Sequence, residues 1–307
     1  MFKENLKYAK PFLKWAGGKT QLLDKFVNYF PPELAEGKIE NYYEPFLGSG
    51  AVFFYIVQNY PIKKAFLSDI NEELVLTFKV VQKDPYNLIE ELKGLHNKYH
   101  SLTEKEQESF FYSIRDEYNS SKTTFDFKKH TTLWANRAAK MVFLNKTCFN
   151  GLYRLNRKGE FNVPFGRYKN PKILDVENIY NSSNVLQIAD IFVTDFEKVK
   201  RRLSKKFFVY FDPPYRPLSK TASFTSYSKG DFSDIDQIRL ANFFRELGDN
   251  GNKLMLSNSD PLNTERTDDF YIHHYNGFII NRVKALRVIN CKADKRSAIT
   301  ELIITNY

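Results

Sequence analysis

The sequence predicts an α/β fold, in which a parallel sheet with crossover helices is interrupted by an inserted helical module. Strand-like and helix-like runs alternate near the start of the chain, strand-like runs return near its end, and the stretch between them is helical with long polar faces. The 307 residues suit one large domain with an insertion or two modest domains, and an apolar content of 42% is enough to bury a sizeable core.

The alternation is clearest in the first part of the chain. Residues 20–30 carry apolar side chains at helical spacing and stop at two prolines, which predicts a helix. There follow a strand-like run at 41–46, a glycine turn, a helix-like run at 51–60, a second strand-like run at 64–69 and a second helix-like run at 71–82. Strand–helix–strand connections of this kind join parallel strands.

The middle of the chain has a different character. Residues 84–145 are mostly helical in pattern, whereas residues 145–172 are rich in Gly, Asn, Arg, Lys and aromatic side chains and show no helical period. Strand-like runs then return at residues 185–196, 207–211, 252–259 and 297–307. We therefore predict a core domain of residues 1–75 and 175–307, with an inserted domain of residues 76–174.

Charge and the rarer residue types limit the function classes. A net charge of +10 fits a polyanionic partner such as nucleic acid, although a basic surface that only serves solubility has the same composition. Cys148 and Cys291 have neither a zinc spacing nor the number needed for a disulfide framework. His96 and His100 are one helical turn apart, but no third ligand is apparent, so we expect a surface pair and no metal.

The chain shows no sign of export or membrane insertion. Its N-terminus lacks the apolar core of a signal peptide, and no stretch approaches about 20 uninterrupted apolar residues. We therefore expect a cytoplasmic protein without a membrane span.

A glycine turn at 47–50 lies between a predicted strand and a predicted helix. Gly48 and Gly50 allow a sharp turn and a close approach of a ligand, although an ordinary loop has the same pattern. Asp69 follows Gly50 by 69 − 50 = 19 residues, at the end of the next strand, where a carboxylate can bind both hydroxyls of a ribose. Because no phosphate-binding motif accompanies the turn, S-adenosylmethionine fits better than a nucleotide.

A further acid follows the strand-like run at 185–196. Asp195 could accept a hydrogen bond from the adenine amino group of the cofactor, and Phe196 could stack on the base. Asp195 could equally be the N-cap of a helix, and the sequence leaves both interpretations open.

The sharpest motif is Asp-Pro-Pro-Tyr, residues 212–215, directly after an apolar run. An exocyclic amine of adenine is a poor nucleophile, because its lone pair is delocalised into the ring. The Asp212 carboxylate and the Pro213 carbonyl can accept its two N–H bonds, and the prolines fix both acceptors. Tyr215 offers a face for the base. The alternative is a proline turn that merely closes a strand.

With these motifs in place, the sequence resembles the Dam family of DNA adenine-N6 methyltransferases, in the arrangement that has the cofactor motif first, the recognition region second and Asp-Pro-Pro-Tyr third. The resemblance covers nearly the whole chain. Its segments are PFLKWAGGK at 11–19, EPFLGSG at 44–50, SDIN at 68–71, FNGLYRLNRKGEFNVPFGRYKNP at 149–171, DPPY at 212–215, FTSY at 224–227 and LSNS at 256–259.

The resemblance implies roles for further residues. Trp15 and Lys19 face the cofactor in the family. It supports Asp69 for the ribose, Asp195 with Phe196 for the adenine moiety, and Asp212 for catalysis. The residues that we expect at the cofactor are Trp15, Lys19, Phe46, Gly48, Gly50, Asp69, Asp195, Phe196 and Asp212.

The resemblance also implies that residues 149–171 read GATC in double-stranded DNA. Arg154 matches the arginine that reads guanine, which suits its two parallel donors. Phe149 stands where a relative has a tyrosine wedge; it keeps the stacking face and lacks the hydroxyl. Arg167 is among the cations that can neutralise phosphates. The DNA contacts that we expect are Phe149, Leu152, Arg154, Pro164, Arg167 and Tyr168.

The predicted fold class is thus a Rossmann-like S-adenosylmethionine-dependent methyltransferase sheet with an inserted, mostly helical DNA-recognition domain. Two other functions remain open at this point: an amine methyltransferase acting on RNA or on a protein glutamine, and a non-catalytic DNA-binding regulator. The regulator would need none of Trp15, Lys19, Asp69 and Asp212. The sequence does not decide whether a companion restriction endonuclease is a partner.

Overall fold

A computed structural model describes residues 8–129, 131–202, 206–216, 232–265, 267–285 and 299–307. Two compact units make up the chain. Unit 1 comprises residues 1–19, 47–59 and 68–193, and unit 2 comprises residues 20–46, 60–67 and 194–307.

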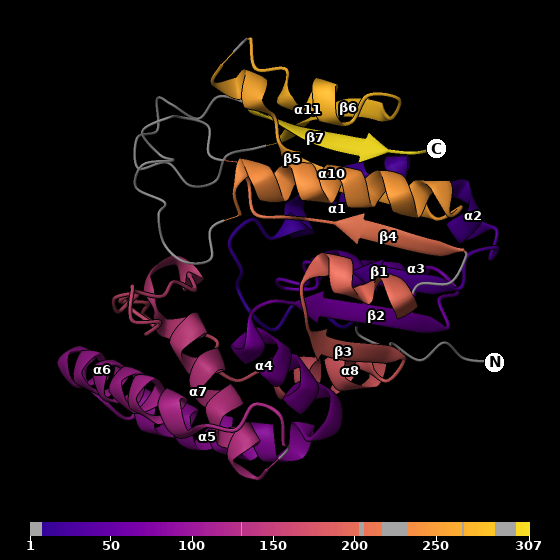
Figure 1. The fold of residues 1–307 in the computed structure, drawn as a ribbon. Helices are drawn as coiled ribbons and strands as arrows, with labels where there is room; N and C mark the ends of the chain where they lie inside the picture. Colours follow the sequence, from indigo (N-terminus) through magenta and orange to yellow (C-terminus); the bar gives the residue numbers. More distant parts are fainter. Residues whose placement is uncertain (1–7, 130, 203–205, 217–231, 266, 286–298) are drawn as a thin grey trace. The chain divides into compact units, whose positions relative to one another are not determined.

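Within the described part of the chain, the strands form one sheet in the order β3-β2-β1-β4-β5-β7-β6 (Figure 1). β1 is parallel to β2 and β4, and β4 is parallel to β5, whereas β7 is antiparallel to β5 and β6. The predicted α/β sheet is confirmed, and β7 runs antiparallel to its two neighbours near one edge. The strands are β1 (Asn41–Glu44), β2 (Lys64–Asp69), β3 (Ala189–Val193), β4 (Phe207–Phe211), β5 (Lys253–Ser259), β6 (Ile279–Ala285) and β7 (Ile299–Thr305).

The core of unit 2 is built around β4. All five of its residues are buried, as expected for a central strand covered on both faces. α10 (Asp234–Asp249) begins with a capping box between Ser233 and Asp236 and packs against β5. The shorter helices are α1 (Leu23–Phe26), η2 (Val27–Tyr29), α2 (Pro32–Ala35), η5 (Phe196–Arg202), η6 (Pro261–Asn263) and α11 (Phe270–His274).

The prediction of one continuous helix over residues 20–30 is wrong. The stretch is divided into η1 (Lys19–Gln21), α1 and η2, none longer than four residues. Pro31 is extended, as expected before another proline, and Pro32 then begins α2, because a proline lacks the N–H that the first helical turn leaves unused.

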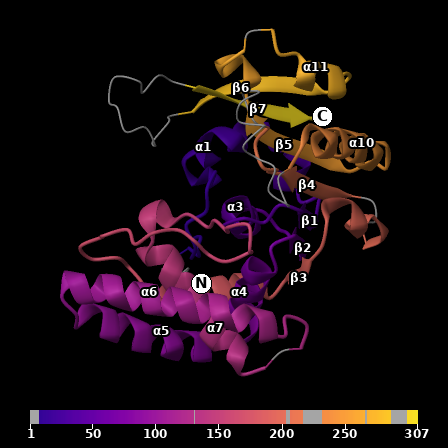
Figure 2. The same cartoon turned by 60° about the vertical axis from the view of Figure 1, so that its left-hand side comes forward.

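Unit 1 is dominated by helices. α5, α6 and α7 lie side by side, and α7 also contacts α4 (Figure 2). α7 is buried around most of its circumference, which explains its weak apolar periodicity. The helices are α3 (Ala51–Asn59), α4 (Glu72–Lys83), α5 (Pro85–His100), α6 (Glu104–Ser120), η3 (Ser121–Thr124), α7 (Leu133–Thr147), η4 (Phe149–Gly151) and α8 (Val176–Leu186).

The predicted inserted domain, residues 76–174, lies wholly within unit 1, together with the N-terminal motif and the glycine turn. That domain boundary remains a prediction. No helix in the described ranges is long and apolar enough to cross a membrane.

Candidate functional site

The glycine turn and the first predicted acid lie together in unit 1. Gly48 and Gly50 both have positive φ, which favours glycine. Asp69 ends β2, and its carboxylate accepts hydrogen bonds from the N–H groups of Gly48 at 3.3 Å and Asn71 at 2.9 Å. Burial raises the pKa of Asp69 to about 6, although these backbone hydrogen bonds favour the ionised form. The turn therefore holds a carboxylate at the end of a strand.

Trp15 lies against the same turn. A Cβ on Gly48 would come within 3.1 Å of the Trp15 indole, so a side chain there would displace the ring. The indole also stacks on Tyr153, with ring centroids 5.4 Å apart and planes 19° apart. Lys19 is buried, and its ammonium group donates to the Gly17 carbonyl at 3.0 Å. In unit 1, Trp15 and Asp69 thus lie against one glycine.

The second predicted acid and its aromatic neighbours belong to unit 2. Asp195 accepts a hydrogen bond from the Glu197 N–H at 3.1 Å, which is the capping geometry that the alternative interpretation of this acid expects. Its carboxylate also binds Arg239 Nη2 at 2.9 Å. Phe196 is buried, and its ring centroid lies 5.5 Å from that of half-buried Phe46 and 4.9 Å from the Arg239 guanidinium.

Sequence reasoning missed Arg239. This residue of α10 forms ion pairs with Asp195, Glu197 and Asp236, at 2.9, 2.9 and 2.8 Å. The spacing between Asp236 and Arg239 predicts their own pair on one helix face. No local pattern links α10 to Asp195, so this carboxylate's partner could not be read from the sequence.

The Asp-Pro-Pro-Tyr motif begins directly after β4. Asp212 is half-buried, and its Oδ1 accepts a hydrogen bond from Ser257 Oγ at 3.4 Å. Ser257 comes from β5, whose parallel register with β4 pairs Phe211 with Leu256. The Ser257 and Tyr210 hydroxyls are 2.7 Å apart. The sheet therefore places a short chain of hydroxyl groups behind the carboxylate.

The later residues of the motif have polar partners from other elements of unit 2. The Pro214 carbonyl accepts a hydrogen bond from buried Gln237 Nε2 of α10 at 3.0 Å. The Tyr215 hydroxyl donates to the carboxylate of Glu301 in β7, while the tyrosine side chain stays exposed. Arg216 pairs with aspartates of α10 and of the segment before α11. We call residues 212–216 the Asp212 turn.

Residues 149–172, which we call the basic segment, are irregular but packed. The Phe149 N–H donates to the Pro164 carbonyl at 2.9 Å, and the Gly166 N–H donates to the last carbonyl of α7 at 2.8 Å. Phe161 and Phe165 are buried, so these two aromatics belong to the core of unit 1.

The predicted DNA contacts are at least partly accessible. Arg154 is exposed, and its Nε donates to Asn162 Oδ1 at 2.8 Å, which orients the guanidinium. Arg167 pairs with Glu108 of α6 at 3.4 Å. Phe149, Arg154, Pro164 and Arg167 are exposed, and Leu152 and Tyr168 are half-buried.

Gly166 is a second feature that sequence reasoning missed. A Cβ at this position would lie 2.6 Å from the Cys148 carbonyl oxygen and 2.7 Å from the Tyr168 ring. Cys148 itself is buried, and burial raises the pKa of its thiol to about 11, which makes it a packing residue rather than a nucleophile.

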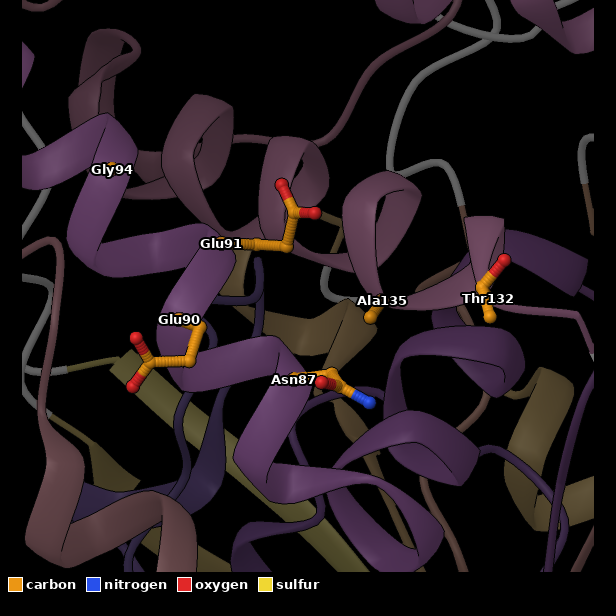
Figure 3. Close-up of a pocket in the computed structure, with 6 residues that line it drawn as sticks. All are labelled: Asn87, Glu90, Glu91, Gly94, Thr132 and Ala135. Atoms are coloured by element: carbon orange, nitrogen blue, oxygen red, sulfur yellow. The ribbon is translucent and has the colours of Figure 1, made fainter.

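A surface pocket in unit 1 contains none of the predicted site residues. It has a volume of about 430 Å³ and is lined by α5, α7 and the residue before α7 (Figure 3). Its lining residues are Asn87, Glu90, Glu91, Gly94, Thr132 and Ala135. A second pocket, of about 310 Å³, includes Asn162, the partner of Arg154.

The rings of His96 and His100 lie 4.4 Å apart. Over the residues that the structure covers, no group of three His, Cys, Asp or Glu side chains could hold a metal ion. The FTSY motif at 224–227 and Cys291 lie outside the described residues.

Comparison with known proteins shows the family of the chain. Residues 15–289 match the sequence profile of the D12 class N6 adenine-specific DNA methyltransferases. The chain is 54% identical to the type II methyltransferase M.MjaIII of Methanocaldococcus jannaschii, with 97% of this chain and 99% of that protein aligned. It is 39% identical to the type II methyltransferase M1.LlaDCHI of Lactococcus lactis subsp. cremoris, over 100% and 99%. It is also 32% identical to the DNA adenine methylase of Escherichia coli, over 97% and 95%.

Proposed function

Because the chain belongs to the D12 class N6 adenine-specific DNA methyltransferases, we propose that it methylates N6 of adenine within GATC in double-stranded DNA, with S-adenosylmethionine as the methyl donor. The observation that carries the proposal is the Asp212 turn. It follows a buried central strand, and separate elements of unit 2 hold its residues.

The Asp212 turn suits an amine substrate. The Asp212 carboxylate and the Pro213 carbonyl accept the two N–H bonds of the target amine, which draws the nitrogen toward a pyramidal geometry and frees its lone pair. Ser257 donates to the carboxylate and limits its rotation. Tyr215 has an exposed side chain with a fixed hydroxyl, so its ring can receive a base rotated out of the duplex.

The residues of unit 1 fit a nucleoside cofactor. Asp69 places a carboxylate at the end of β2, and a Cβ on Gly48 would crowd the Trp15 indole. When bound, S-adenosylmethionine supplies an electrophilic methyl group on a sulfonium. Asp69 would bind the ribose, beside Trp15 and Lys19. In unit 2, Phe46, Asp195 and Phe196 would meet the adenine moiety.

The basic segment supports the proposed sequence preference. Arg154 presents an exposed guanidinium that Asn162 orients, and a bidentate contact to guanine needs such a geometry. The resemblance to Dam enzymes in this segment points to GATC.

Methylation of a plasmid that lacks adenine methylation tests the proposal. With S-adenosylmethionine, we expect protection from an endonuclease that adenine methylation in GATC blocks, and N6-methyladenine by mass spectrometry of the nucleosides. Asp212→Ala provides the inactive control. Methyl groups found on cytosine, or on adenine in unrelated sequences, would overturn the proposed specificity.

We also propose that the chain partners a restriction endonuclease of the same specificity, because two similar proteins are named type II methyltransferases. Co-expression with a GATC-cleaving endonuclease should permit cell growth, and Asp212→Ala should not. Death of cells that carry the active chain would contradict this partnership.

A further inference from the structure

The N-terminal motif is bound directly to the basic segment within unit 1. Asn145 of α7 is buried, and its side chain accepts from the Lys14 N–H and donates to the Lys14 carbonyl, both at 2.8 Å. The same side-chain amide donates to the Gly151 carbonyl at 3.0 Å. One side chain thus fixes the backbone next to Trp15 and the backbone of the basic segment.

Trp15, which follows Lys14, makes a second connection between the N-terminal motif and the basic segment. Trp15 packs against Gly48 of the glycine turn and stacks on Tyr153 of the basic segment. Tyr153 also packs against buried Phe161, with ring centroids 5.8 Å apart. A displacement of the indole would therefore change the packing of both the glycine turn and the basic segment.

A buried ion pair makes a third connection, between α7 and α4. Arg137 of α7 makes a two-pronged contact with Glu73 of α4, at 2.8 Å through Nε, and both side chains are almost completely buried. The Arg137 guanidinium lies 4.4 Å from the ring centroid of Tyr118, which packs edge-on against Phe161. Burial, followed by the charge of Glu73, raises the pKa of the Tyr153 hydroxyl.

Glu73 leads back to the predicted ribose-binding acid. The Asn71 side chain accepts from the Glu73 N–H at 3.1 Å, and the Asn71 N–H donates to Asp69 at 2.9 Å. Asp69 in turn accepts from the Gly48 N–H. The contacts therefore form a ring that starts and ends at Gly48.

We propose that Tyr153 is a positioning residue that couples cofactor binding at the glycine turn to the order of the basic segment. The inference rests on the proposed function, because it takes the turn as the cofactor site and the segment as the DNA reader. A ligand that fixes Trp15 and Asp69 then restricts the segment before DNA arrives. The cofactor thereby tightens the binding of cognate DNA, and by linkage cognate DNA tightens the binding of the cofactor by the same factor.

Hydrogen exchange of the full chain tests the coupling without DNA. In the wild type, saturating S-adenosylhomocysteine should slow amide exchange of residues 149–168 by about fivefold or more, the lower end of usual coupling factors. Tyr153→Phe keeps the stacked ring and should keep the protection. Tyr153→Leu should still bind S-adenosylhomocysteine in calorimetry. In this variant, the ligand should change the amide exchange rate of residues 149–168 by less than about twofold. Equal protection in the Leu variant, or none in the saturated wild type, overturns the proposal.

A binding measurement on the wild type keeps the proposal testable if Tyr153→Leu does not fold. A GATC duplex should tighten S-adenosylhomocysteine binding by about fivefold or more. No tightening, although both ligands bind, contradicts the coupling. Failure of the proposed function gives different results: no S-adenosylhomocysteine binding contradicts both ideas, whereas the expected coupling with methylation outside GATC contradicts the sequence preference alone.

Discussion

The Asp212 turn of unit 2 and the basic segment of unit 1 are both irregular stretches that follow a regular element, but different groups hold them. In the turn, Ser257, Gln237 and Glu301 each bind a different residue of the motif. In the basic segment, buried aromatic rings, backbone hydrogen bonds and the side chains of Asn119 and Asn145 hold the backbone, and most of the predicted contact side chains are exposed.

The difference agrees with the role that we propose for each stretch. Methyl transfer to an amine requires two acceptors at fixed positions, so binding energy is best used to hold the acceptors before the substrate arrives. Reading a base pair requires side chains that can reach the groove, so the scaffold has to be rigid while the side chains stay accessible.

Removing the carboxylate of the turn should have the largest effect. Asp212→Ala is expected to lower the methylation rate constant by about 100-fold or more, because an acceptor that acts mainly in the transition state is lost. Single-turnover kinetics measure the rate, and thermal unfolding should change little. Asp249→Ala, at the exposed end of α10, is the matched control. More than about a tenth of the wild-type rate in Asp212→Ala would count against a catalytic carboxylate.

The basic segment should respond in specificity rather than in rate. Arg154→Ala is expected to lose about 1–3 kcal/mol of discrimination at a single base pair, through the loss of two parallel hydrogen bonds to guanine. The measurement is the methylation rate on GATC against its single-base variants at fixed salt.

Lys169 is exposed in the same segment, and Lys169→Ala is the control for this prediction. If this lysine meets only phosphate, its loss should weaken binding to all sequences alike and flatten the salt dependence. If Arg154→Ala also slows every sequence by one factor, Arg154 is a phosphate contact or a structural residue.

The smallest expected effect is a pH dependence of cofactor binding. A ribose hydroxyl needs an ionised Asp69, whose pKa is about 6, so affinity should fall about tenfold between pH 7.5 and pH 5. Stability should change in the opposite sense: a raised pKa means that this group stabilises the fold below its unfolded value near 3.8 and loses that contribution as the pH rises through about 6.

Asp69→Asn separates this effect from general acid damage. The variant cannot ionise, so its S-adenosylhomocysteine affinity, measured by calorimetry, should be weaker at pH 7.5 and nearly independent of pH. A variant that keeps the wild-type pH profile would show that another group titrates.

Local pattern was enough to predict the alternation of strands and helices and the position of Asp69 and Asp212 at strand ends, because those features depend on neighbours in sequence. The partners of these acids depend on distant elements. Glu301 reaches Tyr215 only because β7 pairs antiparallel with β5, and no spacing in the sequence encodes that pairing.

The failed prediction at residues 20–30 has a related cause. Apolar spacing fits one helix there, but packing divides the stretch into pieces of four residues or fewer. β6 was not anticipated because its sequence, IINRVKA, combines an apolar pair with polar residues and lacks a clear run. In both places contacts from the rest of unit 2 decide what the local sequence leaves open.

The closed space around Gly166 limits how this protein can diverge. Any side chain there would push into the Cys148 carbonyl and the Tyr168 ring, so the path of the basic segment is fixed while Phe149, Arg154 and Arg167 remain exposed. Under the proposed role of these side chains in reading DNA, a descendant with a new target sequence would arise by exchanging them on an unchanged loop. Saturation mutagenesis should accordingly recover active variants at Arg154 and almost none at Gly166.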